Sequence, residues 1–185
     1  MVTLMELKDL VAFGADTSDC VQILYDHAVK TPNIRMLELG VRDGVSTLAL
    51  LLAAKKVNGH LWSIDINPCV AAVKTVYDNG LSDFWTFMQG DDRKLLRQTK
   101  FNPIDLVFID TSHEFEHTLF ELTICDNLLS KNGVMLLHDT SIAIYSGVMK
   151  AVNLFMVLPE CSRKKGYVFE ELGTGCGLGK LTKRE

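Results

Sequence analysis

The chain has 185 residues, of which 48% are hydrophobic and 23% are charged, and its formal net charge is −4 at pH 7. This length suits one globular domain with a sizeable core, and the net negative charge gives no indication of a surface for nucleic acid or an anionic membrane. The five cysteines include no C-x-x-C pair, which argues against a disulfide framework or a zinc knuckle. The N-terminal sequence lacks a signal-peptide pattern and no apolar run is long enough to span a membrane, so we expect a cytoplasmic protein.

Helical and strand-like segments follow one another along the whole chain. Residues 1–32 are expected to hold two amphipathic helices, the first with a stripe of Leu4, Leu7, Leu10 and Val11. From residue 33, predicted strands cover 34–39, 60–65, 84–88, 104–110 and 134–137, and predicted helices cover 45–57, 68–77, 91–98, 113–129 and 142–158. Two last strands, 167–171 and 178–182, have no helix between them. The pattern predicts a single α/β domain, 1–185, with a doubly wound, mostly parallel seven-stranded sheet and a C-terminal antiparallel hairpin.

Charged and small residues gather where the predicted strands end. They are Glu38, Gly40, Asp65, Gly90, Asp91, Asp110, His113, His138 and Asp139. Open parallel sheets bind ligands outside the carboxyl ends of their strands. Carboxylates that are grouped together repel one another and lose solvation. A contribution to stability therefore does not explain why acidic residues gather at these strand ends. The sequence therefore predicts a ligand site at this edge.

The first strand is followed by a glycine turn that differs from a dinucleotide fingerprint. Gly40 lets the backbone approach a ligand and Gly44 opens the next helix. Arg42 and Val45 stand where G-x-G-x-x-G requires glycine, which disfavours a nicotinamide cofactor. Asp65, at the end of the second strand, can accept hydrogen bonds from ribose hydroxyls; the alternative is that it caps the following helix.

Five stretches occur in a characteristic order. They are Leu37-Glu38-Leu39-Gly40 with Gly44 and Ser46, Ser63-Ile64-Asp65-Ile66-Asn67-Pro68, Gln89-Gly90-Asp91, Phe108-Ile109-Asp110-Thr111-Ser112-His113 and Asn132-Gly133-Val134-Met135-Leu136-Leu137-His138-Asp139-Thr140. On these residues the chain resembles class I S-adenosylmethionine-dependent methyltransferases, specifically the metal-assisted small-molecule O-methyltransferases typified by catechol and macrolide-sugar enzymes. The resemblance covers residue 34 to the C-terminus. It implies a Rossmann-like core at 33–185 and methyl transfer to a hydroxyl.

The resemblance also implies a cofactor-binding set. Glu38, Gly40 and Ser46 would face the methionine portion of S-adenosylmethionine, Asp65 would hold the ribose, and Asp91 after Gly90 would lie against the adenine. The full expected set is Glu38, Gly40, Gly44, Ser46, Asp65, Gly90, Asp91 and Asp110.

A metal pair and a base are implied in the same way. Asp110 and Asp139 would bind Mg²⁺, and His113 would act as the catalytic base. Thr140 stands where the catechol enzymes carry an amide ligand, so the third protein ligand is open. His138 could replace it, but strand alternation predicts that it points away from Asp139. The alternatives are that Asp139 caps a helix and that His113 faces solvent at a helix start.

Two other functions stay open. His113 to His117 reads H-E-x-x-H, the zinc-peptidase signature, in which Glu114 would be the base. A protein that binds S-adenosylmethionine without catalysis is the other alternative. For partners we expect a small-molecule methyl acceptor, neither nucleic acid nor membrane, and a homodimer through the apolar helix 142–158.

Overall fold

The computed structural model describes residues 6–11, 17–141, 145–158, 166–173 and 175–183. The chain divides into two compact units, residues 1–91 and 92–185. The single-domain organisation expected from the sequence stays a prediction. No helix among the described ranges is long and apolar enough to cross a membrane.

The first unit is a three-stranded parallel sheet with helices. Its strands are β1 (Arg35–Leu39), β2 (His60–Asp65) and β3 (Trp85–Gln89), in the order β3-β2-β1. Its helices are α1 (Leu7–Val11), α2 (Val21–Ala28), α3 (Val45–Val57) and α4 (Val70–Asp78), and the 3₁₀ turn η1 is Ser82–Phe84. Leu39 pairs with Ile64, and Asp65 pairs with Gln89. The three carboxyl ends therefore lie at one edge, as expected.

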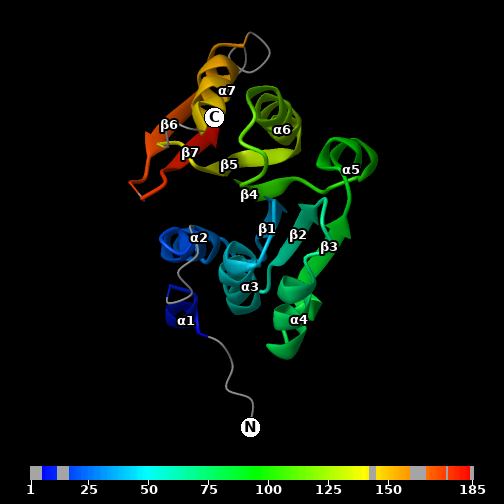
Figure 1. The fold of residues 1–185 in the computed structure, drawn as a ribbon. Coiled ribbons are helices and arrows are strands. Elements are labelled where there is room, and N and C mark those ends of the chain that lie inside the picture. The colour runs from blue at the N-terminus through cyan, green and yellow to red at the C-terminus, as the bar shows by residue number, and fades with distance from the viewer. Residues whose placement is uncertain (1–5, 12–16, 142–144, 159–165, 174, 184–185) are drawn as a thin grey trace. The chain divides into compact units, whose positions relative to one another are not determined.

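Helix α3 forms the centre of the first unit's core. It is apolar nearly all round, and its residues 45–51, 53 and 54 are buried. It packs against α2, which buries Val21, Leu24 and Ala28 (Figure 1). The expected stripe on the first helix includes Leu4, which lies outside the described residues; Leu10 is fully buried. Burial of these side chains removes apolar surface from water, and the β1–α3 turn rests on this packing.

The second unit is a mixed sheet that ends in a hairpin. Its strands are β4 (Ile104–Ile109), β5 (Leu129–His138), β6 (Tyr167–Glu171) and β7 (Leu178–Lys183), in the order β4-β5-β7-β6. Its helices are α5 (Asp92–Gln98), α6 (Phe115–Leu128) and α7 (Ser146–Val157). Strands β4 and β5 are parallel, whereas β7 runs antiparallel to both β5 and β6. The expected antiparallel C-terminal hairpin is confirmed.

Helix α6 differs from the prediction in its start and in its buried face. It begins at Phe115, so His113 precedes it. Its buried residues are Thr118, Glu121, Leu122 and Cys125. Phe115, whose apolar side chain suggests a place in the core, is 36% exposed. The buried face is therefore rotated and includes a carboxylate. Helix α7 begins at Ser146, and the first residues of its predicted span, 142–144, lie outside the described ranges.

Candidate functional site

Glu38 is the buried centre of the first unit's turn. Its side chain is fully buried at the end of β1. Its carboxylate accepts hydrogen bonds from the hydroxyls of Ser46 at 2.8 Å, Thr47 at 2.8 Å and Ser63 at 2.7 Å. Three hydroxyl donors replace the water that a buried carboxylate loses. Glu38 therefore joins β1 to the start of α3 and to β2, and the expected pair Glu38 and Ser46 is in direct contact.

The turn that follows β1 has a left-handed backbone at three positions. Gly40 has a φ of 92° and Gly44 a φ of 85°, while Arg42 adopts a φ of 48°. A side chain at Gly44 would also collide with α4, because an added Cβ would lie 2.7 Å from Ala72 Cβ. Gly44 is thus required both by its backbone and by the close approach of α4.

Asp65 anchors this turn from the end of β2. Its Oδ2 accepts hydrogen bonds from the backbone N–H groups of Val41 at 2.8 Å and Arg42 at 3.0 Å, and its Oδ1 accepts one from Asn67 at 2.8 Å. Burial acts to raise the pKa of Asp65, but these backbone donors outweigh it and the pKa is lowered. A carboxylate has about four acceptor positions. Asp65 therefore keeps little capacity for ribose hydroxyls, and its contact with ribose stays a prediction.

Gly90 and Asp91 follow the third strand of the first unit. Gly90 N–H donates to the backbone oxygen of Asp65 at 2.8 Å, so the two strand ends are joined. Asp91 is partly buried beside them, which leaves its expected contact with adenine untested. Trp85 donates its Nε1–H to Ser63 at 2.8 Å and stacks on Phe87, with ring centroids 5.4 Å apart, so its indole belongs to the packing of β2 and β3.

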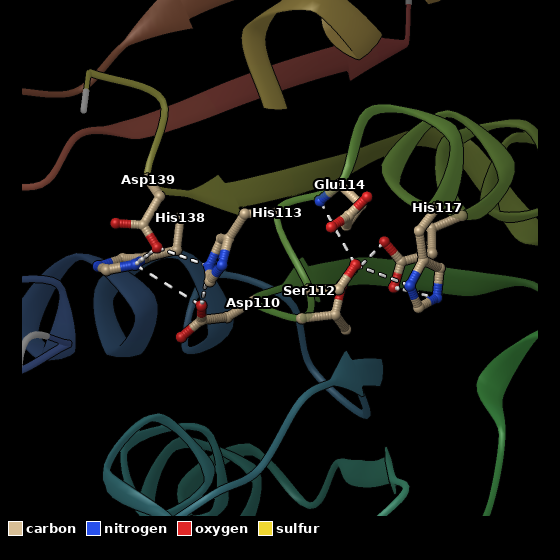
Figure 2. A network of polar contacts seen from close by, with 9 residues as sticks. Asp110, Ser112, His113, Glu114, His117, His138 and Asp139 are labelled. Atoms are coloured by element: carbon tan, nitrogen blue, oxygen red, sulfur yellow. Dashed lines mark hydrogen bonds and ion pairs between the residues drawn. The ribbon is translucent and has the colours of Figure 1, made fainter. Parts of the chain in front are cut away.

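In the second unit, the two expected metal ligands lie on either side of the expected base. His113 Nε2 is 2.7 Å from Asp139 Oδ2 and 3.3 Å from Asp110 Oδ1. The side chains of His113, Asp110 and Asp139 are 21%, 18% and 7% exposed, so the group is sheltered but reachable from solvent. Figure 2 shows the three side chains converging from the ends of β4 and β5. The structure brings the three residues together, and their roles as base and metal ligands stay predictions.

Backbone strain accompanies this convergence. His113 has a φ of 59° and Asp139 a φ of 60°, both in the left-handed region. Such conformations in non-glycine residues cost free energy and cluster at functional sites. Asp139 follows the last residue of β5, so the strand alternation does not extend to it. The expectation that His138 points away from Asp139 is therefore wrong, because His138 Nδ1 lies 3.1 Å from Asp139 Oδ2.

The charges of the group are strongly coupled. Hydrogen bonds to Asp110 and Asp139 raise the pKa of His113 to about 9, although burial opposes the shift. Burial acts to raise the pKa of Asp139, but hydrogen bonds from His113 and His138 outweigh it and hold the pKa well below its ordinary value. At neutral pH the imidazole is therefore cationic between two carboxylates. The ring of Tyr145 stacks on His113, with centroids 4.3 Å apart and an interplanar angle of 24°.

Thr140 faces a different partner. Its hydroxyl donates to Glu171 Oε2 at 2.7 Å, and Glu171 Oε1 accepts from the backbone N–H of Leu178 at 2.9 Å. Thr140 thus fixes the end of β5 to the C-terminal hairpin. The side chain of His138, which ends β5, contacts Asp139 instead.

The H-E-x-x-H segment does not form a zinc-peptidase arrangement. Helix α6 begins after His113, so the two histidines do not lie one turn apart on a helix. His113 turns to Asp110 and Asp139, whereas His117 Nε2 lies 2.9 Å from both carboxylate oxygens of Asp92. Figure 2 shows the two histidines in separate groups. The metallopeptidase alternative is therefore wrong for this chain.

Residues 37–140 match the family model described as Methyltransferase domain. The match covers more than half of the chain. The chain belongs to this family. The matched segment of the methyltransferase domain includes every residue of the cofactor-binding, base and metal sets expected from the sequence, from Glu38 to Asp139.

Several known proteins are similar to this chain in sequence or in fold. The O-methyltransferase ankF of Aspergillus thermomutatus is 27% identical over 123 residues, which are 65% of this chain and 50% of that protein. The chain spans about half the length of the curated relatives it matches. Cofactor-bound Rv0187 from MTB has a TM-score of 0.78 at 18% identity, over 97% of this chain and 88% of that one. The O-methyltransferase TomG of Streptomyces achromogenes, solved with SAM, has a TM-score of 0.74 at 16% identity, over 100% and 93%.

The structural matches show the fold of the methyltransferase domain. It is the expected Rossmann-like α/β fold with a mostly parallel, seven-stranded sheet and an antiparallel C-terminal hairpin.

Sequence reasoning missed a second polar cluster in the methyltransferase domain. Asp92, His117 and Glu121 each offer a ligand atom, and these atoms lie within 4.8 Å of one another. Helical spacing places His117 and Glu121 on one face of α6, and Asp92 follows β3 at the edge where ligands were expected. The H-E-x-x-H pattern suggested His113 as the partner of His117. In the structure the partner of His117 is Asp92.

Proposed function

We propose that this methyltransferase domain transfers a methyl group from S-adenosylmethionine to a hydroxyl of a small molecule. The observation that carries the proposal is the group His113, Asp110 and Asp139, with His113 Nε2 at 2.7 and 3.3 Å from the two carboxylates. Family membership and the similar O-methyltransferases support the same activity. A protein that binds the cofactor without catalysis would have no use for this strained, charged group.

The first unit would bind the cofactor. Buried Glu38 holds the start of α3, and Asp65 holds the backbone of Val41 and Arg42 by two hydrogen bonds. These contacts shape the glycine turn before any ligand arrives, which reduces the ordering cost of binding. In our proposal the turn contacts the methionine portion, Asp65 offers its remaining acceptor capacity to the ribose, and Asp91 lies against the adenine.

The second unit would activate the acceptor. Asp110 and Asp139 fit a hard divalent cation, since two carboxylates and solvent suit Mg²⁺. Such a cation, when bound, lowers the pKa of an acceptor hydroxyl. His113 would take the hydroxyl proton at Nε2 as the acceptor oxygen forms its bond to the methyl carbon and the carbon–sulfur bond breaks.

The pKa of His113 adds a condition to this role. Because this pKa is about 9, the imidazole is protonated at neutral pH as long as no metal ion binds the two carboxylates. A protonated imidazole cannot accept the hydroxyl proton. His113 therefore becomes a base only when the negative charges of Asp110 and Asp139 are balanced by another cation, which makes the metal a requirement of the proposal.

Binding and turnover test the two halves of the proposal separately. Calorimetry of chelator-treated protein should show saturable binding of S-adenosylmethionine and none of NAD. Asp91→Asn should weaken that binding, while Asp83→Asn, a matched change at an exposed acid of the same unit, should not. Binding of NAD in preference to S-adenosylmethionine would contradict the proposal.

Turnover should depend on the metal and on His113. Methyl transfer to catechols and to sugars with adjacent hydroxyls should stop with chelator and return with Mg²⁺. His113→Gln and Asp139→Asn should abolish it without loss of cofactor binding, and Glu116→Gln, an exposed change on α6, should leave it unchanged. Chelator-resistant turnover would refute the metal-assisted mechanism.

The location and the partners are proposals as well. A cytoplasmic location is supported by the free cysteines Cys20, Cys69, Cys125 and Cys176 among the described residues. We also propose a small-molecule acceptor, no nucleic-acid or membrane partner, and a homodimer through the apolar segment 142–158, which includes α7. Sedimentation that shows only monomer at high concentration would remove the dimer.

A further inference from the structure

The cluster of Asp92, His117 and Glu121 contains a buried carboxylate oxygen with no hydrogen-bond partner. Glu121 is fully buried on α6, and its Oε1 has no hydrogen bond within the described part of the chain. The nearest ligand atom on its own helix is His117 Nε2, at 3.8 Å. The same nitrogen lies 2.9 Å from Asp92 Oδ1 and Oδ2. One nitrogen and the oxygens of two carboxylates therefore converge on one sheltered point.

Packing alone does not explain this arrangement. Glu121 lies within the buried face of α6 together with Leu122 and Cys125, where an apolar side chain would be expected. Burial, and then the nearby Asp92, raise the pKa of Glu121 well above its ordinary value. Buried charges in proteins are normally paired or bound to metals. A bound cation would give Glu121 Oε1 the partner that it lacks.

The neighbouring side chains orient the ligand atoms as in a metal site. Ser112 Oγ lies 2.8 Å from His117 Nδ1, which leaves Nε2 for another partner. Thr111 donates its hydroxyl to Glu121 Oε2 at 3.0 Å, which leaves Oε1. Metal-binding histidines commonly use their second ring nitrogen in this way, and ligating carboxylates are also hydrogen-bonded.

The spacing of the ligand atoms suits a small transition-metal ion. Tetrahedral Zn²⁺ with ligands at about 2.0–2.1 Å separates neighbouring ligand atoms by about 3.3 Å. The observed separations from His117 Nε2, 2.9 Å to Asp92 and 3.8 Å to Glu121, lie on either side of that value. We propose that Asp92, His117 and Glu121 bind a divalent transition-metal ion, with Zn²⁺ preferred over Mg²⁺. The ion would link Asp92 at the start of α5 to His117 and Glu121 on α6.

This site is distinct from the pair Asp110 and Asp139. It includes the imidazole of His117, whose Nδ1 contacts Ser112 and whose Nε2 faces the carboxylates. An imidazole ligand favours Zn²⁺ over Mg²⁺. It contains no residue of the proposed methyl-transfer machinery. Its ion therefore has a structural role, and the proposal does not depend on the proposed catalytic activity.

Zinc titration in a background without the other pair tests the proposal. The full chain carrying Asp110→Asn and Asp139→Asn, freed of metal by chelator, is titrated calorimetrically with ZnCl₂ in excess MgCl₂. We expect one saturable equivalent of Zn²⁺. Adding Glu121→Gln or His117→Asn should weaken the affinity at least tenfold, while His60→Gln, a matched change at a histidine of the first unit, should leave it unchanged. Binding should also raise the Tm of the background chain but not that of its Glu121→Gln version.

X-ray absorption at the zinc edge provides a second measurement on the unsubstituted cluster. Nitrogen and oxygen ligands with an imidazole signature are expected. Absence of saturable binding, binding that neither Glu121→Gln nor His117→Asn weakens, or sulfur in the coordination shell would overturn the proposal. Glu121→Gln keeps the side-chain shape and removes a buried carboxylate, so its metal-free Tm should not fall below that of the background chain. If it does, His117→Asn and the absorption spectrum decide.

Discussion

Replacing Gly44 by alanine should strain both the backbone of the turn and its contact with α4. Gly44 has a φ of 85°, and the left-handed conformation costs an L-residue about 1–2 kcal/mol. The new Cβ would lie 2.7 Å from Ala72 Cβ and 3.2 Å from Ala72 Cα, and overpacking of this kind costs about 1–3 kcal/mol. We therefore expect Gly44→Ala to lower the free energy of unfolding by about 2–5 kcal/mol, together with weaker cofactor binding.

A double-mutant cycle with Ala72→Gly separates the two contributions. Ala72→Gly removes the clashing Cβ but not the strain at φ of residue 44. The double variant should therefore lose about 1–3 kcal/mol less unfolding free energy than the sum of the two single losses. Urea unfolding of the four chains at equal m-values measures this coupling. Losses that add within about 0.5 kcal/mol would refute the close approach of α4 to the turn.

The remaining predictions concern the two halves of the candidate site. Glu38→Gln should destabilise the chain by about 1–3 kcal/mol, because one of three buried hydroxyls loses its acceptor; urea unfolding measures this loss. The lowered pKa of Asp65 stabilises the fold above its ordinary value of 3.8, and this contribution disappears as the pH falls through the folded-state pKa. The advantage of the wild type over Asp65→Asn, followed by unfolding from pH 7 to 2, should therefore shrink in acid; a constant difference would contradict the assignment. Tyr145→Ala should lower kcat about 2–10-fold with little change in KM, since the lost ring contact with His113 is worth about 0.5–1.5 kcal/mol. Tyr145→Phe keeps the ring and should keep the kcat of the wild type.

The order and type of the elements could be predicted because periodicity and turn residues agree along the chain. The strand at His60–Asp65 and the helix at Val45–Val57 have the predicted bounds, since each lies between glycine and asparagine residues that favour turns. The start of α6 could not be predicted, because His113 adopts a left-handed φ that no propensity indicates. Its buried face was misjudged because Phe115 looks like a core residue and Glu121 like a solvent-facing one.

The predicted metal pair and base came together because all three follow neighbouring parallel strands, β4 and β5, whose ends meet at one edge. The role of Asp65 in holding the turn was not predicted, because it depends on hydrogen bonds to the backbone of Val41 and Arg42. The cluster around Glu121 was missed for a similar reason. Its third member, Asp92, lies 25 positions from His117 in the sequence, and only the fold brings them together.

The separation of His113 from His117 occurs where α7 closely approaches the start of α6. Gly147 lies so close to this segment that a Cβ there would be 2.3 Å from the backbone oxygen of His113 and 2.8 Å from the nitrogen of Phe115. This approach occupies the space beside residues 113–115 and is compatible with the left-handed turn at His113. The turn directs the imidazole of His113 to Asp139, while His117, inside the helix, faces Asp92. A five-residue segment thus supplies one histidine to each of two clusters, because a helix start lies between them.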